Sequence, residues 1–157
     1  MTNPAIQDYY ADSVSHCYGC GRLNPAGLHI RTHWQDGVSI CHFTPKPEHV
    51  AIPGYVYGGL IASLIDCHGV GTAAAAKYQE EGRAWDSAPH IRCVTGSLHV
   101  DFMKPTPHGP ELELRGVVAE IKGRKVTVDI TVSAAGEITA TGRVVAIQIP
   151  DGFMEAA

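Results

Sequence analysis

The sequence predicts an α+β fold in which a curved antiparallel sheet wraps around one long helix. A segment from about residue 58 to 78 is apolar on nearly every side, which is typical of a helix buried on most faces. Alternating apolar and polar residues before and after this segment are typical of half-buried strands. A helix that is apolar all round needs a sheet that curves around it, so helix and sheet are expected to form one core.

The predicted elements follow in a simple order along the 157 residues. A short polar helix or arm at 4–15 and a loop rich in Gly, Pro and Asn at 17–27 precede a hairpin formed by strands at 28–34 and 38–43. After the helix, strands are expected at about 91–103, 110–121, 124–134 and 137–149. We therefore expect a single domain spanning 1–157, with an N-terminal arm of about residues 1–27.

Composition excludes several classes of function. The chain is 45% hydrophobic and 18% charged, as in globular proteins, and its net charge of −4 comes without a basic cluster, which disfavours nucleic acid as a partner. We expect no membrane span, and the N-terminus lacks the features of a signal peptide. Five scattered cysteines disfavour a disulfide framework, so a reduced, cytoplasmic protein is expected.

The start of the helix carries the chemistry. Gly58 and Gly59 open the helix, where free backbone N–H groups and a partial positive charge can hold an oxyanion. Asp66 interrupts the apolar face about two turns later, where a carboxylate costs desolvation energy. An anion hole and a carboxylate are the two parts that an ester or thioester hydrolase needs.

Three motifs resemble a known family. Tyr57-Gly58-Gly59 followed by Leu64-Ile65-Asp66 is similar to the His-Gly-Gly…Leu-x-Asp signature of hotdog-fold acyl-CoA thioesterases of the phenylacetate-pathway type. The stretch from Cys17 to Leu28 resembles an N-terminal element of one branch, Cys-x-Gly-Cys-Gly…Asn-Pro-x-Gly-Leu, and 100–105 resembles the strand after the helix.

This resemblance implies a hotdog fold, with five or six antiparallel strands around one central helix. It also implies a homodimer or a dimer of dimers, with sheets paired edge to edge and active sites at the dimer interface. The implied substrate is an acyl-CoA, hydrolysed without a metal or redox cofactor, because coenzyme A is itself part of the substrate.

The resemblance assigns roles to individual residues. Asp66 corresponds to an aspartate that acts as general base on water or as nucleophile; the alternative is a carboxylate that makes only a salt bridge or caps a loop. The amides of Gly58 and Gly59 are oxyanion-hole candidates, unless they merely let the chain turn into the helix. Thr95 lies where some relatives carry a hydroxyl that orients the water, although threonine is also common in strands for its β-propensity.

Substrate binding involves a second set of candidates. Tyr57 stands where the family usually has histidine, and His49 is a possible substitute for an Asn or Gln that many relatives carry in the preceding loop. Lys104, Arg124 and Lys125 are candidates for the coenzyme A phosphates, with solvated surface charge as the alternative.

The distance along the helix favours a shared site. Gly58 and Asp66 are eight residues apart, which is about 12 Å along a helix axis. Groups that act on one carbonyl must lie within hydrogen-bonding reach of it or of its water. We therefore expect the glycines of one chain to face the aspartate of a two-fold partner.

Cys17 and Cys20, beside His16, form half of a possible zinc site. No second cysteine pair has metal-like spacing, so we expect no metal and interpret the motif as a tightly packed glycine-rich loop. Cys67, which follows Asp66, is expected to be a small core residue.

Two other functions compete with hydrolysis. A non-catalytic protein that binds acyl thioesters or another small ligand is favoured by Tyr57 and the altered preceding loop. An acyl-thioester hydratase or dehydratase is disfavoured, because such enzymes usually pair an Asp with a nearby His, and here Asp66 and His68 project on different sides of a helix.

Overall fold

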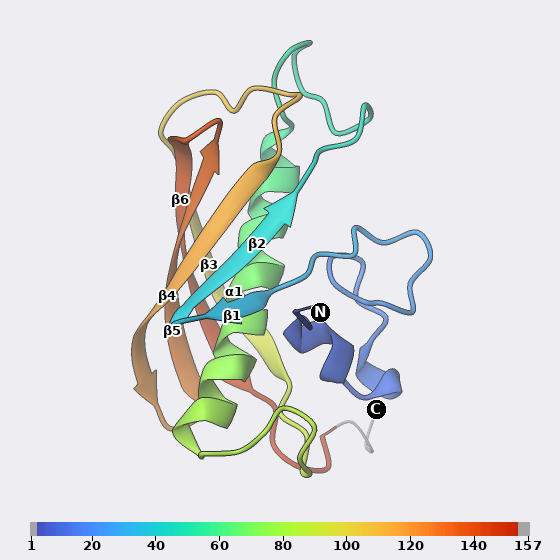
Figure 1. The fold of residues 1–157 in the computed structure, drawn as a ribbon, viewed down its shortest axis with the longest axis vertical. Helices are drawn as coiled ribbons and strands as arrows, with labels where there is room; N and C mark the ends of the chain where they lie inside the picture. Colours follow the sequence, from blue (N-terminus) through green and yellow to red (C-terminus); the bar gives the residue numbers. More distant parts are fainter. Residues whose placement is uncertain (1–2, 154–157) are drawn as a thin grey trace.

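A computed structural model describes residues 3–153 and consists of one long helix, α1 (Gly58–Glu80), packed against a six-stranded antiparallel sheet (Figure 1). The strands lie in the order β1-β2-β4-β5-β6-β3. Their bounds are His33–Gln35 (β1), Val38–Phe43 (β2), Cys93–Phe102 (β3), Leu112–Lys122 (β4), Lys125–Ala134 (β5) and Glu137–Gln148 (β6). The predicted fold class is confirmed, and the arrangement is that of the hotdog fold.

The core lies between α1 and the inner face of the sheet. Along β5, every second residue is buried against the helix, because successive strand residues point to opposite faces: Val126, Val128, Ile130 and Val132. Gly69 of α1 lets the sheet approach closely, since a Cβ there would lie 2.5 Å from a methyl carbon of Val144 in β6. The helix and these strands begin and end within two residues of their predicted bounds.

By length and composition α1 could cross a membrane, although we expected no membrane span from the sequence. Eighteen residues of this helix have a mean hydropathy of 1.3, but 78% of that stretch is buried inside the protein. Wrapping by the sheet therefore accounts for the apolar character of α1 on most sides, as its pattern predicts.

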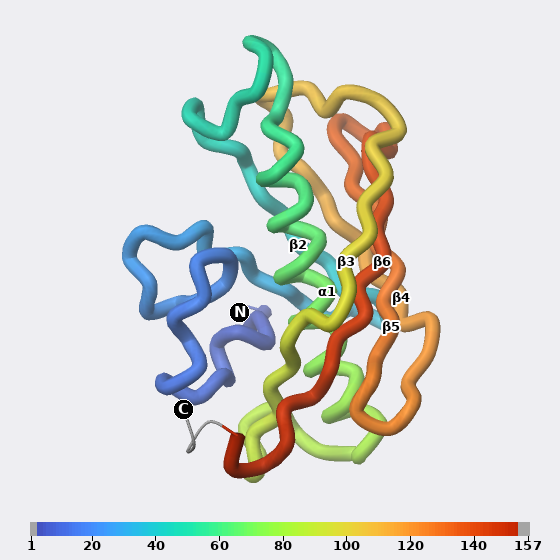
Figure 2. The backbone as a smooth tube through the Cα atoms, turned by 180° about the vertical axis from the view of Figure 1, so that it is seen from behind, coloured from blue at the N-terminus to red at the C-terminus, as the bar shows by residue number. Residues whose placement is uncertain are grey.

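The N-terminal arm differs from its prediction. It forms two short 3₁₀ helices, η1 (Ile6–Tyr9) and η2 (Asp12–Val14), which lie on the side of α1 that the sheet leaves open (Figures 1 and 2). Ile6 is fully buried, and the buried amide of Gln7 exchanges two hydrogen bonds with Thr32: Thr32 N–H donates to Oε1 and Nε2 donates to the threonine hydroxyl. The arm is thus part of the core and not a polar appendage.

The first strand is much shorter than predicted. Residues 28–32 form no strand: His29 has a φ of 57°, and the Leu28 and Ile30 amides donate to the carbonyls of Tyr18 and Gly19 in the preceding loop. The Thr32 carbonyl accepts from Ile6 of the arm. The alternation of apolar and polar residues in this segment reflects burial by the loop and the arm. Burial by a sheet produces the same alternation, so the sequence cannot distinguish the two.

Strand β3 ends the sheet, because within the described chain it pairs only with β6. Thr95, Leu98 and Phe102, here called the inner side of β3, lie opposite three fully buried residues of β6 and therefore share the face that packs on α1: Ala146, Val144 and Ala140. Even so, Leu98 is 40% and Phe102 55% exposed. An exposed edge with apolar side chains on its inner side is a ready surface for pairing with another strand.

Candidate active site

Asp66 lies in the middle of α1, half-buried, where the helix passes the inner side of β3. The hydroxyl of Thr95 donates a hydrogen bond to Asp66 Oδ1. This contact orients the carboxylate and leaves Oδ2 without a protein partner among the described residues. The structure thus brings together Asp66, the main catalytic candidate, and Thr95, the weaker one, in a position that solvent can reach.

The start of α1 presents two amides that the fold does not use. The Tyr57 carbonyl accepts the first helical hydrogen bonds, from the amides of Leu60 and Ile61. Within residues 3–153, the amides of Gly58 and Gly59 have no acceptor, as is usual for the first turn of a helix. These N–H groups are therefore available to an oxyanion.

Tyr57 covers this helix start. Its side chain is 57% exposed, and its ring lies so close to Gly59 that a Cβ there would be 2.4 Å from ring carbon Cε2. A Cβ at Gly58 would meet the Phe102 ring at 3.4 Å. Two aromatic rings therefore flank the free amides, and Gly59 needs its lack of a side chain to accommodate one of them.

The two parts of the site lie at different ends of the inner side of β3. Gly58 is beside Phe102, near the end of the strand, whereas Asp66 is bonded to Thr95, near its beginning. In one chain the helix start and the carboxylate are thus separated along both the helix and the strand. This agrees with the separation of about 12 Å that the helical rise predicts.

His49 supports the helix start through its backbone. The His49 carbonyl accepts from the Tyr57 amide, and His49 Nδ1 accepts from the Lys46 amide within its own loop. Its ring packs beside Phe43, with 5.8 Å between ring centroids. The imidazole thus makes its contacts within and beside the loop that precedes α1.

The three cations proposed for coenzyme A are not brought together. Lys104 follows β3 and forms an ion pair with Glu137. Arg124 and Lys125 lie at the β4–β5 turn, near the last turn of α1, where the Lys77 ammonium donates to the Gly123 carbonyl at 2.9 Å. They therefore lie at opposite ends of the helix and cannot form one patch within a single chain.

His68 is a core residue. Its ring is fully buried and hydrogen-bonded at 3.0 Å to both the Thr32 and the Ser39 hydroxyls. Burial lowers the pKa of His68 to about 3, so the ring is neutral. It points away from the exposed Asp66–Thr95 pair, which confirms that the two side chains project on different sides of α1.

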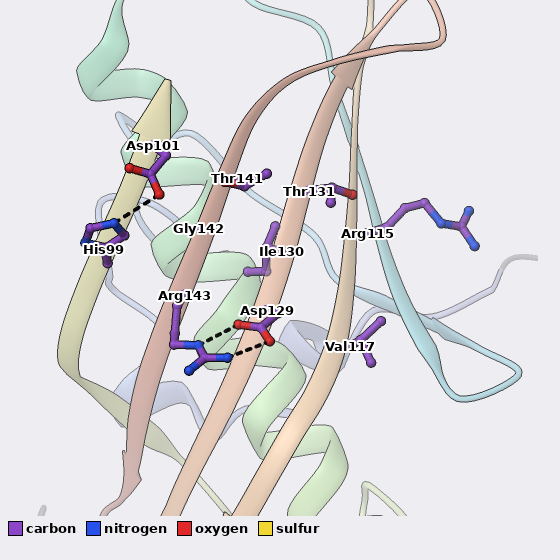
Figure 3. Close-up of a pocket in the computed structure, with 10 residues that line it drawn as sticks. All are labelled: His99, Asp101, Arg115, Val117, Asp129, Ile130, Thr131, Thr141, Gly142 and Arg143. Carbon is purple, nitrogen blue, oxygen red and sulfur yellow. Dashed lines mark hydrogen bonds and ion pairs between the residues drawn. The ribbon is translucent and has the colours of Figure 1, made fainter. Parts of the chain in front are cut away.

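A cavity of about 550 Å³ lies on the outer face of the sheet (Figure 3). Its wall includes a bidentate ion pair, in which Arg143 Nε and Nη2 donate to the two carboxylate oxygens of Asp129 at 2.7 and 2.9 Å. Asp129 lies between buried Val128 and Ile130 of β5, so it faces away from α1. This cavity is thus on the opposite face of the sheet from Asp66.

A cluster of three cysteines escaped the sequence prediction. The sulfur of Cys67, one residue after Asp66, lies 3.8 Å from that of Cys17, and Cys20 completes the group. Fifty residues separate Cys17 from Cys67, and no local spacing signals such a contact. The Cys17–Cys20 motif alone therefore indicated only two of the three thiols that the fold brings together.

Comparison with known proteins agrees with this geometry. The sequence model of the thioesterase superfamily matches residues 53–145, which include α1 and β3. A thioesterase superfamily protein from Shewanella loihica has a solved structure that is 44% identical, with a TM-score of 0.68 over 90% of this chain and 100% of the other. The PaaI protein of Escherichia coli is similar in fold, with a TM-score of 0.63 at 17% identity over 78% of this chain and 81% of the other.

Curated relatives match over a shorter part. The acyl-coenzyme A thioesterase THEM4 of Xenopus laevis is 34% identical over 87 residues, which cover 55% of this chain and 33% of that protein. The chain thus spans about a third of the length of the curated relatives it matches. Because the family model matches more than half of the sequence and includes the helix that bears Asp66, the chain belongs to the thioesterase superfamily.

Proposed function

We propose that this protein hydrolyses acyl-CoA thioesters to a free acid and coenzyme A. The observation that carries the proposal is the hydrogen bond from Thr95 to Asp66, which holds a solvent-reachable carboxylate in a fixed direction on an otherwise apolar helix. Membership of the thioesterase superfamily and the names of the curated relatives support the same substrate class.

In the proposed reaction Asp66 acts through the carboxylate oxygen that Thr95 leaves free. As general base it takes a proton from water, and the hydroxide attacks the thioester carbonyl. The amide of Gly58 or Gly59 then stabilises the oxyanion of the tetrahedral intermediate. Collapse breaks the C–S bond, and the departing thiolate receives the proton from Asp66.

Nucleophilic attack by Asp66 is the other route, and it would pass through an anhydride that water then cleaves. The two routes make different predictions for single turnover in ¹⁸O-labelled water. General-base catalysis places the label only in the acid product. The anhydride route instead yields an unlabelled acid in the first turnover if water attacks the aspartyl carbonyl. The labelled atom then remains on Asp66.

We propose that the complete site forms between two chains. Strand β3 is an exposed edge, and pairing with a second copy about a two-fold axis is antiparallel. Such pairing reverses the strand, so the Phe102 end of one chain lies beside the Thr95 end of the other. The free amides at Gly58 would then approach the partner's Asp66.

The activity is tested on a panel of aliphatic and aryl acyl-CoAs, with hydrolysis measured as the release of free thiol. Replacing Asp66 by Asn keeps the size of the side chain but removes its basicity, so Asp66→Asn should lower kcat by about 10²–10⁴-fold. Asp101→Asn is the matched control, because Asp101 is an aspartate of β3 that lies on the outer face of the sheet and contacts His99 instead of Asp66. Unchanged turnover in Asp66→Asn would exclude the proposed role.

A protein that binds acyl thioesters without hydrolysing them is the second candidate. It is favoured by Tyr57, which stands where the family usually has histidine and whose ring lies against Gly59 beside the free amides. Binding of acyl-CoA by the wild type, with no turnover on any member of the panel, would favour this candidate over hydrolysis.

A further inference from the structure

Three thiols from distant parts of the chain meet at one point. Cys17 and Cys20 come from the loop that follows η2, and Cys67 comes from α1. Their three sulfur atoms all lie within 4.8 Å of one another. Cys20 and Cys67 are buried and Cys17 is half-buried, so two of the thiols are shielded from solvent and one is accessible.

The spacing of the sulfurs suits a shared metal ion better than a disulfide. Cys17 Sγ and Cys67 Sγ are 3.8 Å apart. Thiolates on a tetrahedral zinc ion, with Zn–S bonds of about 2.3 Å, lie about 3.8 Å from one another. A disulfide needs about 2.05 Å, so oxidation would require the two segments to move together.

The loop is shaped to bring its sulfurs to the helix. The Gly21 amide donates to the Cys17 carbonyl at 2.8 Å and closes a tight turn around the Cys-x-x-Cys motif. Gly19 sits so close to α1 that a Cβ there would lie 2.3 Å from the Cys67 sulfur. Only a residue without a side chain allows this approach.

A cationic side chain lies beside the cluster, because Arg92 lines the same cavity as Cys17. Arg92 is held nearby by a hydrogen bond of 2.6 Å from Nη1 to the Cys93 carbonyl. Three thiolates around a divalent ion carry one net negative charge, which this guanidinium can balance.

A cavity of about 270 Å³ gives access to the cluster, and its wall includes Cys17, Arg92 and His16. His16 lies outside the group of mutually close ligand atoms. The fourth coordination position is thus open to a solvent molecule, as it is in zinc sites with three protein ligands.

We propose that Cys17, Cys20 and Cys67 bind a zinc ion as thiolates, with a solvent molecule from the adjacent cavity as the fourth ligand. Binding releases the three thiol protons. The ion joins the N-terminal loop to α1 immediately after Asp66, and it is independent of the hydrolytic reaction. Soft thiolate ligands select zinc and other thiophilic ions over magnesium or calcium.

Metal content and cobalt substitution test the site. The full chain is purified under reducing conditions without chelators, dialysed and analysed for zinc by mass spectrometry. Co²⁺ added to the chelator-treated protein reports thiolate ligation by a sulfur-to-metal charge-transfer band in the near ultraviolet. Cys67→Ser removes one ligand, and Cys41→Ser and Cys93→Ser are matched controls, because both are fully buried cysteines outside the cluster.

The expected result is one zinc ion per chain in the wild type and in both controls, with loss of the bound zinc in Cys67→Ser. The wild type should also show the cobalt charge-transfer band, which vanishes on adding zinc. Because the band is measured on the unaltered chain, the test holds even if Cys67→Ser does not fold. A wild type that takes up neither zinc nor Co²⁺ under reducing conditions overturns the proposal, as does equal zinc content in Cys67→Ser.

Discussion

The hydroxyl of Thr95, on edge strand β3, donates a hydrogen bond to the carboxylate of Asp66, in the middle of α1. The bond fixes one carboxylate oxygen and leaves the other free. It also ties the catalytic candidate to the edge of the sheet, where a second chain can pair. The proposed catalytic role of Asp66 and the proposed pairing of two chains therefore involve the same strand.

Thr95→Val should lower kcat by about 10- to 100-fold, because a hydrogen bond to a charged group contributes about 1.5–3 kcal/mol. KM should change little, since the hydroxyl orients Asp66 and does not hold the acyl chain. Steady-state kinetics on the best acyl-CoA substrate measure both. Thr95→Ser should restore most of the activity, and equal kcat in Thr95→Val and the wild type would show that the bond is dispensable.

Gly59→Ala should lower kcat/KM by about 10²-fold or more, a loss comparable to that of an oxyanion-hole donor. The added methyl would lie 2.4 Å from the Tyr57 ring, so the ring or the helix start must shift. Gly58→Ala is the matched variant, because its methyl meets Phe102 at an ordinary contact distance of 3.4 Å. Adding Tyr57→Ala to Gly59→Ala should recover activity if the ring causes the displacement; a Gly59→Ala enzyme as active as Gly58→Ala would contradict this assignment.

If two chains pair through β3 as proposed, Leu98→Lys should produce a monomer with little activity, because it places a charge on the inner side of this edge strand. Light scattering gives the mass, and the acyl-CoA assay gives the turnover. Val117→Lys is the control: Val117 is also an exposed strand residue, at 54%, but lies in β4, away from the β3 edge. A fully active monomer would rule out a site shared between chains.

Mixing two inactive variants tests the shared site directly. A dimer of one Asp66→Asn chain and one Gly59→Ala chain contains one intact site, formed by the unaltered glycine of the first chain and the unaltered aspartate of the second. Random exchange of subunits should restore about a quarter of the wild-type activity. A mixture that stays inactive after full exchange would show that both groups act within one chain.

His68 predicts a dependence of stability on pH. Its pKa is about 3 in the folded protein against 6.5 for the free side chain, because burial disfavours the charged ring. The unfolded chain therefore binds more protons between these values, and the free energy of unfolding should fall as the pH decreases from about 6.5 towards 3. Urea unfolding at pH 7 and pH 5 should show this decrease, and His68→Gln should remove its share of the slope. Parallel pH profiles for wild type and variant would show that His68 binds protons equally in the folded and unfolded states, which would contradict the lowered pKa.

The central helix and the later strands could be predicted because their patterns reflect one environment each. Alternation in β5 arises from burial against α1, and the apolar character of α1 arises from the sheet around it. Leu28 and Ile30 alternate for another reason, since the loop and the arm cover them. Sequence periodicity reports burial but not the element that provides it.

The candidate site was predictable only where its residues lie on a recognisable motif. Gly58, Gly59 and Asp66 share one helix, and Thr95 was suggested by resemblance rather than by its own pattern. The contact between Cys17 and Cys67 depends on how the loop folds back onto α1. Likewise, sheet topology places Lys104 and Arg124 at opposite ends of the helix, which a list of surface cations cannot reveal.

The buried arm has a consequence for the boundaries of the folding unit. The family match begins at residue 53, yet Ile6 and Gln7 pack where a side chain at Gly71 would otherwise fit. A protein cut back to the matched segment would lose β1 and β2, leave β4 as a second open edge and uncover one face of α1. The segment that the family model matches is therefore smaller than the part that we expect must be expressed to obtain a stable protein.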